Sequence, residues 1–309
     1  MDETPLGVDD GDRIGEFDPA TVSAADGGAG LVVTTGERAY TTVESSVIEI
    51  DPGEPVDEYT GVAAGQTVAA VAGETVYRIT GAVASHQRPV TGARDVFVGP
   101  DDDSLTVLCA DGRLVWLGEK LREMGAKRTA IDPTDAVVAS ASGWTAISEG
   151  ETVYCYREPV DERVAIAEIG PSLLDGAVRD LSFVDGSLVI ATTAGLVSFD
   201  PAGEFERRWT AEHAVTGLSN PAHHQVYGWN DELVRITADG RVTSLASDAR
   251  NVVTTADHGR WYADLSDGAV VAERDDTVSV ELSVEPVGYR DRESVVAAVT
   301  NPTTEEIDY

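Results

Sequence analysis

The sequence predicts an all-β protein, and three observations support this. Short apolar runs rich in Val, Leu, Thr and Tyr are separated by Gly, Asp, Asn and Pro at close intervals, a pattern typical of strands joined by turns. No long stretch has a helical period, and the segment 118–124, which is compatible with a helix, is too short to shape the fold. The third observation is a repeat that runs through most of the chain.

The repeat is clearest in residues 195–203, where a short apolar run is followed by an Asp-Pro turn and a glycine. Related runs are spaced 37, 38, 39, 43, 37 and 36 residues apart and begin at Arg38, Thr75, Arg113, Thr152, Gly195, Glu232 and Gly268. A tight turn and an earlier apolar strand precede this run in the repeat, which indicates a recurring hairpin. A near-constant period of this length is typical of one four-stranded sheet per repeat. We therefore expect a seven-bladed β-propeller.

The register of the fourth repeat rests on an identity of five residues. Residues 73–77 and 150–154 have the same sequence, which places the fourth run at Thr152. A register based on Gly143 would give neighbouring spacings of 30 and 52 residues. We reject that register because it breaks the regular period.

The two ends of the chain have separate roles in this interpretation. Residues 1–283 are predicted to form the propeller, with the N-terminal strand around residues 14–19 supplying the outer strand of the last blade. The pattern changes in residues 284–309, where residues 293–303 resemble the opening strand of an immunoglobulin-like sandwich. One strand cannot form a domain. This segment therefore either packs onto the propeller or begins a sandwich domain of a longer polypeptide, and we favour the second.

The chain is strongly acidic. It has 55 acidic and 22 basic residues, a formal charge of -33 and only two lysines, Lys120 and Lys127, and this composition resembles that of proteins from salt-loving archaea. Molar salt shortens the Debye length to roughly 3 Å and would screen the repulsion. We interpret the charge as adaptation to high salt; the alternative is mimicry of nucleic acid or binding of a basic partner. Direct nucleic-acid binding is disfavoured, because such binding depends on Lys and Arg contacts with phosphate.

The sequence predicts a cytoplasmic protein without a membrane segment. Its first residues have neither a basic region nor an apolar core, and no run of eighteen apolar residues occurs. Two cysteines, Cys109 and Cys155, are too few for a disulfide framework and lie within apolar runs. We expect both thiols to be buried.

The repeats resemble those of quinoprotein-like and gluconolactonase-like propellers, above all in residues 195–203. The resemblance covers roughly residues 12–283 and implies a propeller fold. No Gly-His and Trp-Asp pair recurs in each repeat, unlike in WD repeats. The tryptophans fall at different places in the repeat, unlike in the docking motif of quinone dehydrogenases. The resemblance therefore implies no cofactor.

No catalytic residue, metal ligand or cofactor site is predicted. The sequence has no Gly-x-Ser-x-Gly elbow, no Gly-rich phosphate loop and no Cys-x-x-Cys pair. His213, His223 and His224 lie within a dozen residues, but adjacent side chains in a turn diverge. The aspartates at 101–103 are expected to form a solvated turn rather than a cation site. The widest gap between repeats contains residues 158–163 and 170–176, where we expect an extended loop that either binds a ligand or is decoration.

A periodic basic pattern gives the one candidate binding site. Residues 92–96, 177–181 and 249–252 share an Ala-rich segment with an arginine, and residues 126–129 are a looser match. We place these segments at the beginning of innermost strands, beside the central channel. There they would hold an anion, a carboxylate ligand or an acidic tail through Arg94, Lys127, Arg128, Arg179 and Arg250. In the favoured alternative, each arginine pairs with an aspartate of a neighbouring blade, as the adjacent Asp95 and Asp180 suggest.

These observations favour a non-enzymatic scaffold that binds a protein partner and is adapted to high salt. Regular blades without a catalytic motif are the basis of this hypothesis. One alternative is a metal-dependent, lactonase-like hydrolase, which would need acidic, amide or histidine ligands from several blades. The other is sensing of a small anion at the mouth of the channel.

Overall fold

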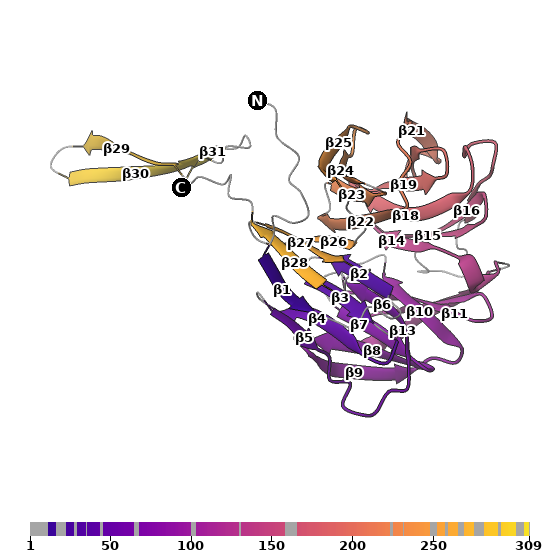
Figure 1. Ribbon diagram of the computed structural model, residues 1–309. Helices are drawn as coiled ribbons and strands as arrows, with labels where there is room; N and C mark the ends of the chain where they lie inside the picture. The colour runs from indigo at the N-terminus through magenta and orange to yellow at the C-terminus, as the bar shows by residue number, and fades with distance from the viewer. Residues whose placement is uncertain are drawn as a thin grey trace.

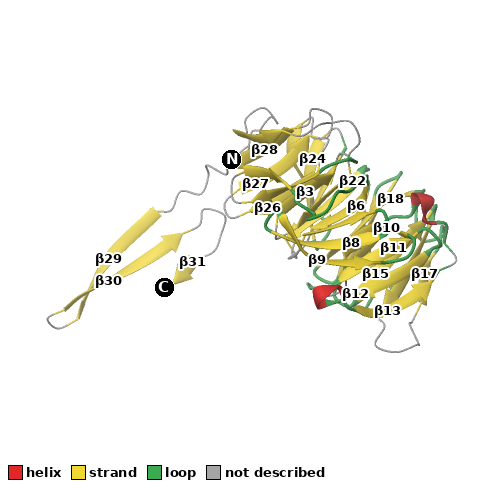
Figure 2. Ribbon diagram, turned by 90° about the horizontal axis from the view of Figure 1, so that it is seen from below, coloured by secondary structure: helices red, strands yellow, loops and turns green. Residues whose placement is uncertain are grey.

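The chain folds into an all-β propeller, as predicted, but consecutive strands form six blades where seven were expected (Figures 1 and 2). The computed structural model describes residues 12–16, 23–27, 30–34, 36–43, 46–64, 68–99, 103–129, 131–157, 166–222, 225–230, 232–247, 252–256, 259–264, 269–274, 281–289, 292–300 and 306–308. Two short 3₁₀ turns, η2 (Glu119–Leu121) and η3 (Pro133–Asp135), interrupt the strands. Among the described residues, no helix is long and apolar enough to cross a bilayer.

Six blades each consist of four consecutive antiparallel strands. Blades 1 to 3 contain β2 (Ser23–Gly27), β3 (Gly30–Thr34), β4 (Ala39–Val43) and β5 (Ser46–Glu49); β6 (Tyr59–Ala64), β7 (Val68–Ala72), β8 (Thr75–Thr80) and β9 (Val83–Pro89); and β10 (Ala93–Val98), β11 (Leu105–Cys109), β12 (Arg113–Leu117) and β13 (Glu123–Arg128). Blades 4 to 6 contain β14 (Val138–Ala141), β15 (Trp144–Glu149), β16 (Thr152–Arg157) and β17 (Ile166–Ile169); β18 (Val178–Val184), β19 (Ser187–Thr192), β20 (Leu196–Asp200) and β21 (Glu206–Ala211); and β22 (Gly217–Ala222), β23 (Gln225–Trp229), β24 (Glu232–Thr237) and β25 (Val242–Ser247). The first strand of each blade contacts the first strand of the next, so this strand is the innermost one.

Two further sheets involve the ends of the chain. The strands β26 (Val252–Ala256), β27 (Gly259–Asp264) and β28 (Ala269–Arg274) form a four-stranded sheet with the N-terminal β1 (Asp12–Glu16), which pairs antiparallel with β28. A separate three-stranded sheet contains β29 (Glu281–Tyr289), β30 (Arg292–Thr300) and β31 (Glu306–Asp308). The boundary predicted after residue 283 falls inside β29.

The predicted strand register is confirmed in the fourth blade. Thr152 begins β16, the third strand in the sheet order β14-β15-β16-β17, and Trp144 begins β15 before it. The Asp-Pro turn after β20 has the predicted role as well. The Asp200 carboxylate accepts a hydrogen bond from the Ala202 N–H at 3.0 Å and pairs with Arg208.

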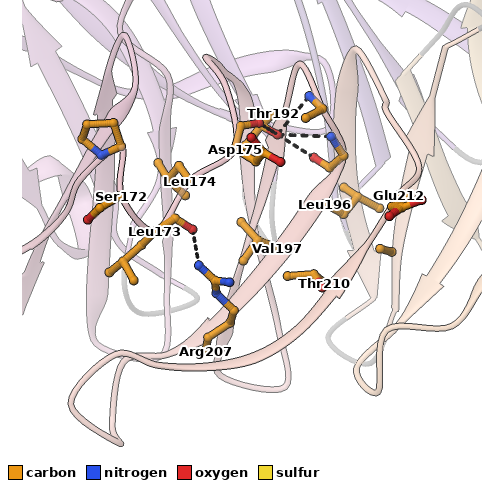
Figure 3. A pocket seen from close by; sticks show the side chains of 14 residues that line it. Ser172, Leu173, Leu174, Asp175, Thr192, Leu196, Val197, Arg207, Thr210 and Glu212 are labelled. Carbon is orange, nitrogen blue, oxygen red and sulfur yellow. Dashed lines mark hydrogen bonds between the residues drawn. The ribbon is translucent and has the colours of Figure 1, made fainter.

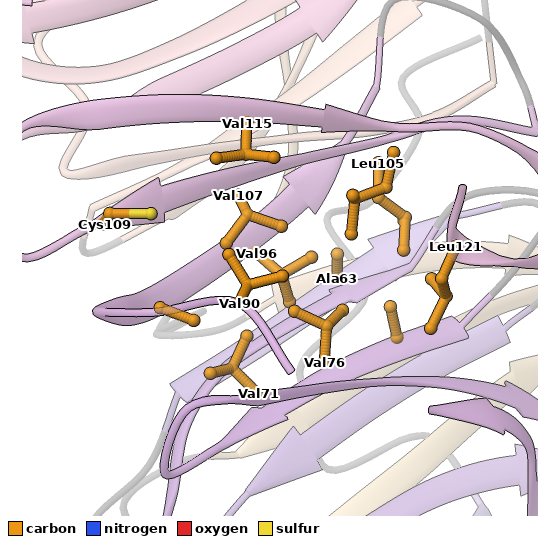
Figure 4. Packing of buried hydrophobic residues seen from close by; sticks show 13 residues of the cluster. Ala63, Val71, Val76, Val90, Val96, Leu105, Val107, Cys109, Val115 and Leu121 are labelled. Carbon is orange, nitrogen blue, oxygen red and sulfur yellow. The ribbon is translucent and has the colours of Figure 1, made fainter. Parts of the chain in front are cut away.

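Both faces of a blade are buried, and each face belongs to a different apolar cluster. In β7, Ala69 and Val71 pack in the cluster shared with blade 3 (Figure 4). The alternate residues Val68, Ala70 and Ala72 pack in the cluster shared with blade 1. Since successive side chains of a strand point to opposite faces, a strand buried on both sides reads as a continuous apolar run. This explains why the apolar runs of the sequence do not alternate with polar residues.

A buried polar network joins blades 3 and 4. The Trp116 side chain of β12 is fully buried, and its indole N–H donates to the Thr145 hydroxyl of β15 at 3.1 Å. The Ser140 hydroxyl of β14 donates to Thr145 at 2.9 Å and lies 3.1 Å from the Thr106 hydroxyl of β11. A buried indole N–H needs an acceptor. The hydroxyls therefore position the tryptophan against the next blade.

Blades 2 and 3 approach most closely where the inner strands β6 and β10 meet. Gly61 of β6 lies against Asp95 of β10, and a Cβ atom at residue 61 would be 2.8 Å from the Asp95 Cα and would overlap its carboxylate. That Cα cannot move without shifting the whole inner strand. Only glycine therefore fits at residue 61, because there is no room for a Cβ atom.

Replacing Gly61 with alanine should lower the free energy of unfolding by about 1–3 kcal/mol, the usual cost of overpacking a core. Gly170→Ala is a matched control, because a Cβ at residue 170 meets no atom within 4 Å. Thermal and urea unfolding followed by circular dichroism would measure both. Equal stability of the two variants would contradict the close approach of β6 and β10.

Candidate functional site

The connection between β17 and β18 forms a loop over blade 5. It begins with a turn in which the N–H groups of Leu173 and Leu174 donate to the Gly170 carbonyl at 2.9 and 3.3 Å. Leu174 is buried in the cluster that contains Val197, whereas Leu173 is 43% exposed. The loop is therefore anchored by one leucine and presents the other to solvent.

Two hydrogen bonds tie this loop to the blade (Figure 3). The Arg207 guanidinium of β21 donates to the Leu173 carbonyl at 2.6 Å. The buried Thr192 hydroxyl, at the end of β19, donates to the Asp175 carbonyl at 2.9 Å. The same hydroxyl accepts from the Ala194 and Gly195 N–H groups at 3.2 Å each. The loop is thus held at both ends by side chains of the blade that it covers.

Gly176 allows the loop to reach the inner strand. Its φ of +99° is one that residues with a Cβ rarely adopt, and a Cβ there would overlap the Thr193 side chain. Beyond it, the Val178 N–H donates to the Gly150 carbonyl of blade 4 at 2.9 Å, and the Thr193 N–H donates to the Ala177 carbonyl at 2.9 Å. The loop therefore bonds to both blades that it connects.

A cavity of about 450 Å³ lies between this loop and blade 5 (Figure 3). Its exposed lining is mainly polar and includes the hydroxyls of Ser172 and Thr210, while Leu174 of the loop and Leu196 and Val197 of β20 lie buried behind it. Charged side chains also line it: Asp175, Arg207 and Glu212. Polar groups placed in a concave site can fix the orientation of a ligand.

The two arginines at the start of β21 have different surroundings. The pairing of β20 and β21 shifts between Ser198 and Phe199, which leaves Arg208 as the extra residue of a β-bulge. Arg208 pairs with Asp200, whereas the guanidinium carbon of Arg207 is 6.0 Å from the centre of the Phe199 ring. Among the described residues, no carboxylate lies within ion-pair distance of Arg207. The bulge therefore separates a neutralised arginine from one that faces the cavity.

Two of the five predicted basic residues are at the beginning of inner strands, as expected. Arg94 and Arg179 are the extra residues of equivalent β-bulges in β10 and β18. Arg94 donates to the Thr134 carbonyl of blade 4 at 2.9 Å, and Arg179 is exposed. Arg250 lies outside the described residues. The bulge is thus the structural meaning of the Arg-Asp pair that these two segments share.

The predicted placement of Lys127 and Arg128 is wrong. Both lie on β13, the outermost strand of blade 3, where they are paired opposite Leu114 and Arg113. Their similarity to the other segments is local, because residues 126–129 end an outer strand instead of beginning an inner one. They do not join Arg94 and Arg179.

The aspartates next to the bulged arginines lie between neighbouring blades. The Asp180 carboxylate accepts from the Leu181 N–H at 2.8 Å and from the Leu218 N–H of blade 6 at 2.7 Å. Burial raises the pKa of Asp180 to about 6, although both N–H groups favour the ionised form. Burial likewise raises the pKa of Asp95 to about 7, against the opposing effects of the Val96 N–H and Arg94. Instead of pairing with an aspartate of a neighbouring blade, Arg94 donates to a backbone carbonyl of blade 4. Asp180 likewise accepts from a backbone N–H of blade 6 instead of pairing with an arginine.

The described residues contain no group of three His, Cys, Asp or Glu side chains arranged to hold a metal ion. His213 lies 3.2 Å from Glu232, while His223 and His224, the aspartates at 101 and 102, and the loop segment 158–163 fall outside the described ranges. Both cysteines are buried, as predicted, and burial raises the pKa of the Cys155 thiol to about 12.

Comparison with known proteins establishes the fold. No family model and no curated protein sequence matches the chain. Among solved structures, it is similar to BBS1N in complex with ARL6DN (12% identity, TM-score 0.58, 89% of this chain and 96% of that one). It is also similar to a chain of the mitotic checkpoint complex (14%, 0.60, 88% and 91%) and to the WD40 domain of Neurospora crassa Pan2 (11%, 0.60, 84% and 90%). Identities this low support a shared fold and carry no activity with them.

Sequence reasoning missed Arg207 and the cavity beside it. The available signal was the 43-residue gap between the fourth and fifth repeats, which predicted the loop. The cavity depends in addition on a bulge in β21 and on the Arg207 and Thr192 hydrogen bonds, which the residue pattern does not reveal.

The raised pKa of Asp180 should make the protein less stable as the pH rises from about 4 to about 6. In this interval the folded state binds more protons than the unfolded state, so the free energy of unfolding falls with pH, by at most about 1.4 kcal/mol per pH unit for one proton. Asp180→Asn should remove this part of the pH dependence of the free energy of unfolding. Glu151 is exposed, so Glu151→Gln should leave that pH dependence unchanged. Urea unfolding at several pH values would measure the difference, and an unchanged slope in Asp180→Asn would contradict it.

Proposed function

We propose that this chain is a non-enzymatic propeller scaffold that binds a protein partner. The observation that carries the proposal is the covered cavity of blade 5, where the exposed Leu173 lies beside an arginine that has no carboxylate partner among the described residues. Arginine is enriched at the energetic centres of protein interfaces. Two of the similar propellers, BBS1N with ARL6DN and the chain of the mitotic checkpoint complex, were solved in assemblies with other proteins.

The alternatives have less support. A metal-dependent, lactonase-like hydrolase would have to take its ligands from residues outside the described ranges. Sensing of an anion at the inner strands would rest on Arg94 and Arg179, and neither of them lines the cavity of blade 5.

We also propose that the propeller has seven blades, the last of which contains β26, β27, β28 and the N-terminal β1. Two observations support this closure. β26 contacts the inner strand β22 on one side and β2 on the other, and β1 extends the sheet at β28. Closing the ring with strands from both ends of the chain removes the exposed edges that an open array would leave. Residues 284–309 would then lie beyond the ring, where the start of an immunoglobulin-like sandwich remains our prediction.

A scaffold of this kind should form a defined complex in its native cells. Chemical cross-linking of the tagged full chain, followed by mass spectrometry, should recover a partner that rebinds when both proteins are purified and mixed. The purified chain should not hydrolyse lactones or esters with or without added divalent ions. Metal-stimulated hydrolysis, together with no partner that rebinds, would overturn the proposal.

The acidic composition leads us to propose adaptation to high salt. In dilute buffer, a net charge of -33 opposes the compact state, and molar salt reduces the Debye length to roughly 3 Å. We expect KCl to raise the melting temperature by roughly 5–10 °C between dilute and molar salt, equivalent to a few kcal/mol in a chain of this size.

A variant with four exposed glutamates changed to glutamine, at Glu58, Glu119, Glu151 and Glu206, should show a smaller rise than the unchanged protein. Calorimetry in a series of KCl concentrations would compare the two. A melting temperature that is independent of salt in both proteins would refute the adaptation.

A further inference from the structure

We propose that the cavity of blade 5 binds an extended peptide segment of the partner, through one acidic side chain that pairs with Arg207 and a neighbouring apolar side chain that contacts Leu173. This inference deepens the proposed function and rests on it. It specifies which side chains the partner segment presents to the scaffold. The geometry of Arg207 carries the argument.

Arg207 is held ready to receive a carboxylate. One terminal amino group of its guanidinium is fixed by the Leu173 carbonyl at 2.6 Å, and the Phe199 ring lies beneath it. A guanidinium has five N–H donors in a planar fork that matches a carboxylate. Figure 3 shows the side chain directed from β21 toward the loop, with the guanidinium beside Val197. The remaining donors are therefore positioned before a ligand arrives, which reduces the entropy lost on binding.

The net charge of the chain makes an arginine without a carboxylate partner among the described residues informative. Acidic residues outnumber basic ones by 55 to 22, and several arginines pair with a carboxylate, as the adjacent Arg208 does with Asp200. Arg207 instead has a neutral carbonyl as its hydrogen-bond partner. A carboxylate supplied by another molecule would complete a charge-assisted pair, which is stronger than a bond between neutral groups.

The other charged side chains of the cavity limit what can bind. Asp175 and Glu212 also line it, and in Figure 3 both lie away from the Arg207 guanidinium. Their carboxylates repel a second acidic group, so polyphosphates and nucleic acids are disfavoured. A segment with one acidic residue, placed at Arg207, limits this repulsion.

The exposed Leu173 favours a peptide over a small carboxylate. It is 43% exposed at the rim, whereas Leu196 and Val197 behind it are buried. The volume of about 450 Å³ suits one or two side chains rather than a folded domain. A peptide can place an acidic side chain at Arg207 and cover the exposed leucine with its neighbour.

The test selects peptides from a random seven-residue display library on the immobilised full chain, at physiological and at molar salt. Enriched sequences should share Asp or Glu within two residues of Leu, Ile, Val or Phe. Arg207→Gln should weaken the best synthetic peptide at least about tenfold, as expected for the loss of a charge-assisted hydrogen bond. Arg208→Gln, whose arginine does not line the cavity, should change the affinity less than about twofold.

A double-mutant cycle ties the effect to one contact. Changing the acidic residue of the peptide to its amide should weaken binding to the unchanged protein and have little further effect on Arg207→Gln. Arg207→Lys, which keeps the charge but not the fork, should bind with intermediate affinity, and Leu173→Ser should weaken binding without affecting the dependence on the acidic group. Melting temperatures of all variants would show that they are folded.

Several results would overturn the inference. They are enriched peptides that lack an acidic residue, an affinity that is unchanged in Arg207→Gln, or equally tight binding of N-acetyl-aspartate amide alone. A partner that binds Arg207→Gln as well as the unchanged protein would refute this site and leave the scaffold function standing. Selected peptides that depend on Arg207, in the absence of any cellular partner, would support the site and refute the scaffold function.

Discussion

Each blade has two apolar faces, and only neighbouring blades can cover both. The alternate residues of β7 belong to different clusters, one shared with blade 1 and the other with blade 3. Most burial is therefore between blades rather than within them, and a blade has little reason to be stable alone. Polar contacts across the same interfaces, such as those of Trp116 with Thr145 and of Asp180 with Leu218, fix how one sheet lies on the next.

The fold was predictable because every blade must bury both of its faces, so the same residue pattern repeats along the chain. A strand buried on both sides must be apolar throughout, and the turn after it requires small or polar residues, so the same signal returns in every blade. The signal is strong enough to place Thr152 correctly at the start of β16. It does not tell an inner strand from an outer one when only four residues are compared, which is why Lys127 and Arg128 were misplaced.

The candidate site was only partly predictable. The length of the loop before β18 is visible as an excess over the regular period, but the function of Arg207 depends on contacts between residues far apart in the sequence. Its guanidinium meets Leu173, 34 positions earlier in the chain, and the bulge at Arg208 decides which arginine reaches the cavity. The bulges at Arg94 and Arg179 have the same origin: an extra residue in an inner strand changes the direction of a side chain without altering the local composition.

The pairing of β1 with β28 has a consequence for how the chain is made. Gly15 and Val270 are partners although 255 positions separate them. A ribosome adds about 5–20 residues per second, so β1 waits on the order of tens of seconds for β28, beside which it lies. During that time the earlier blades can pack against one another, but the N-terminal strand has no partner. The pairing of β1 with β28 therefore has to follow the synthesis of every blade that lies between them in the sequence.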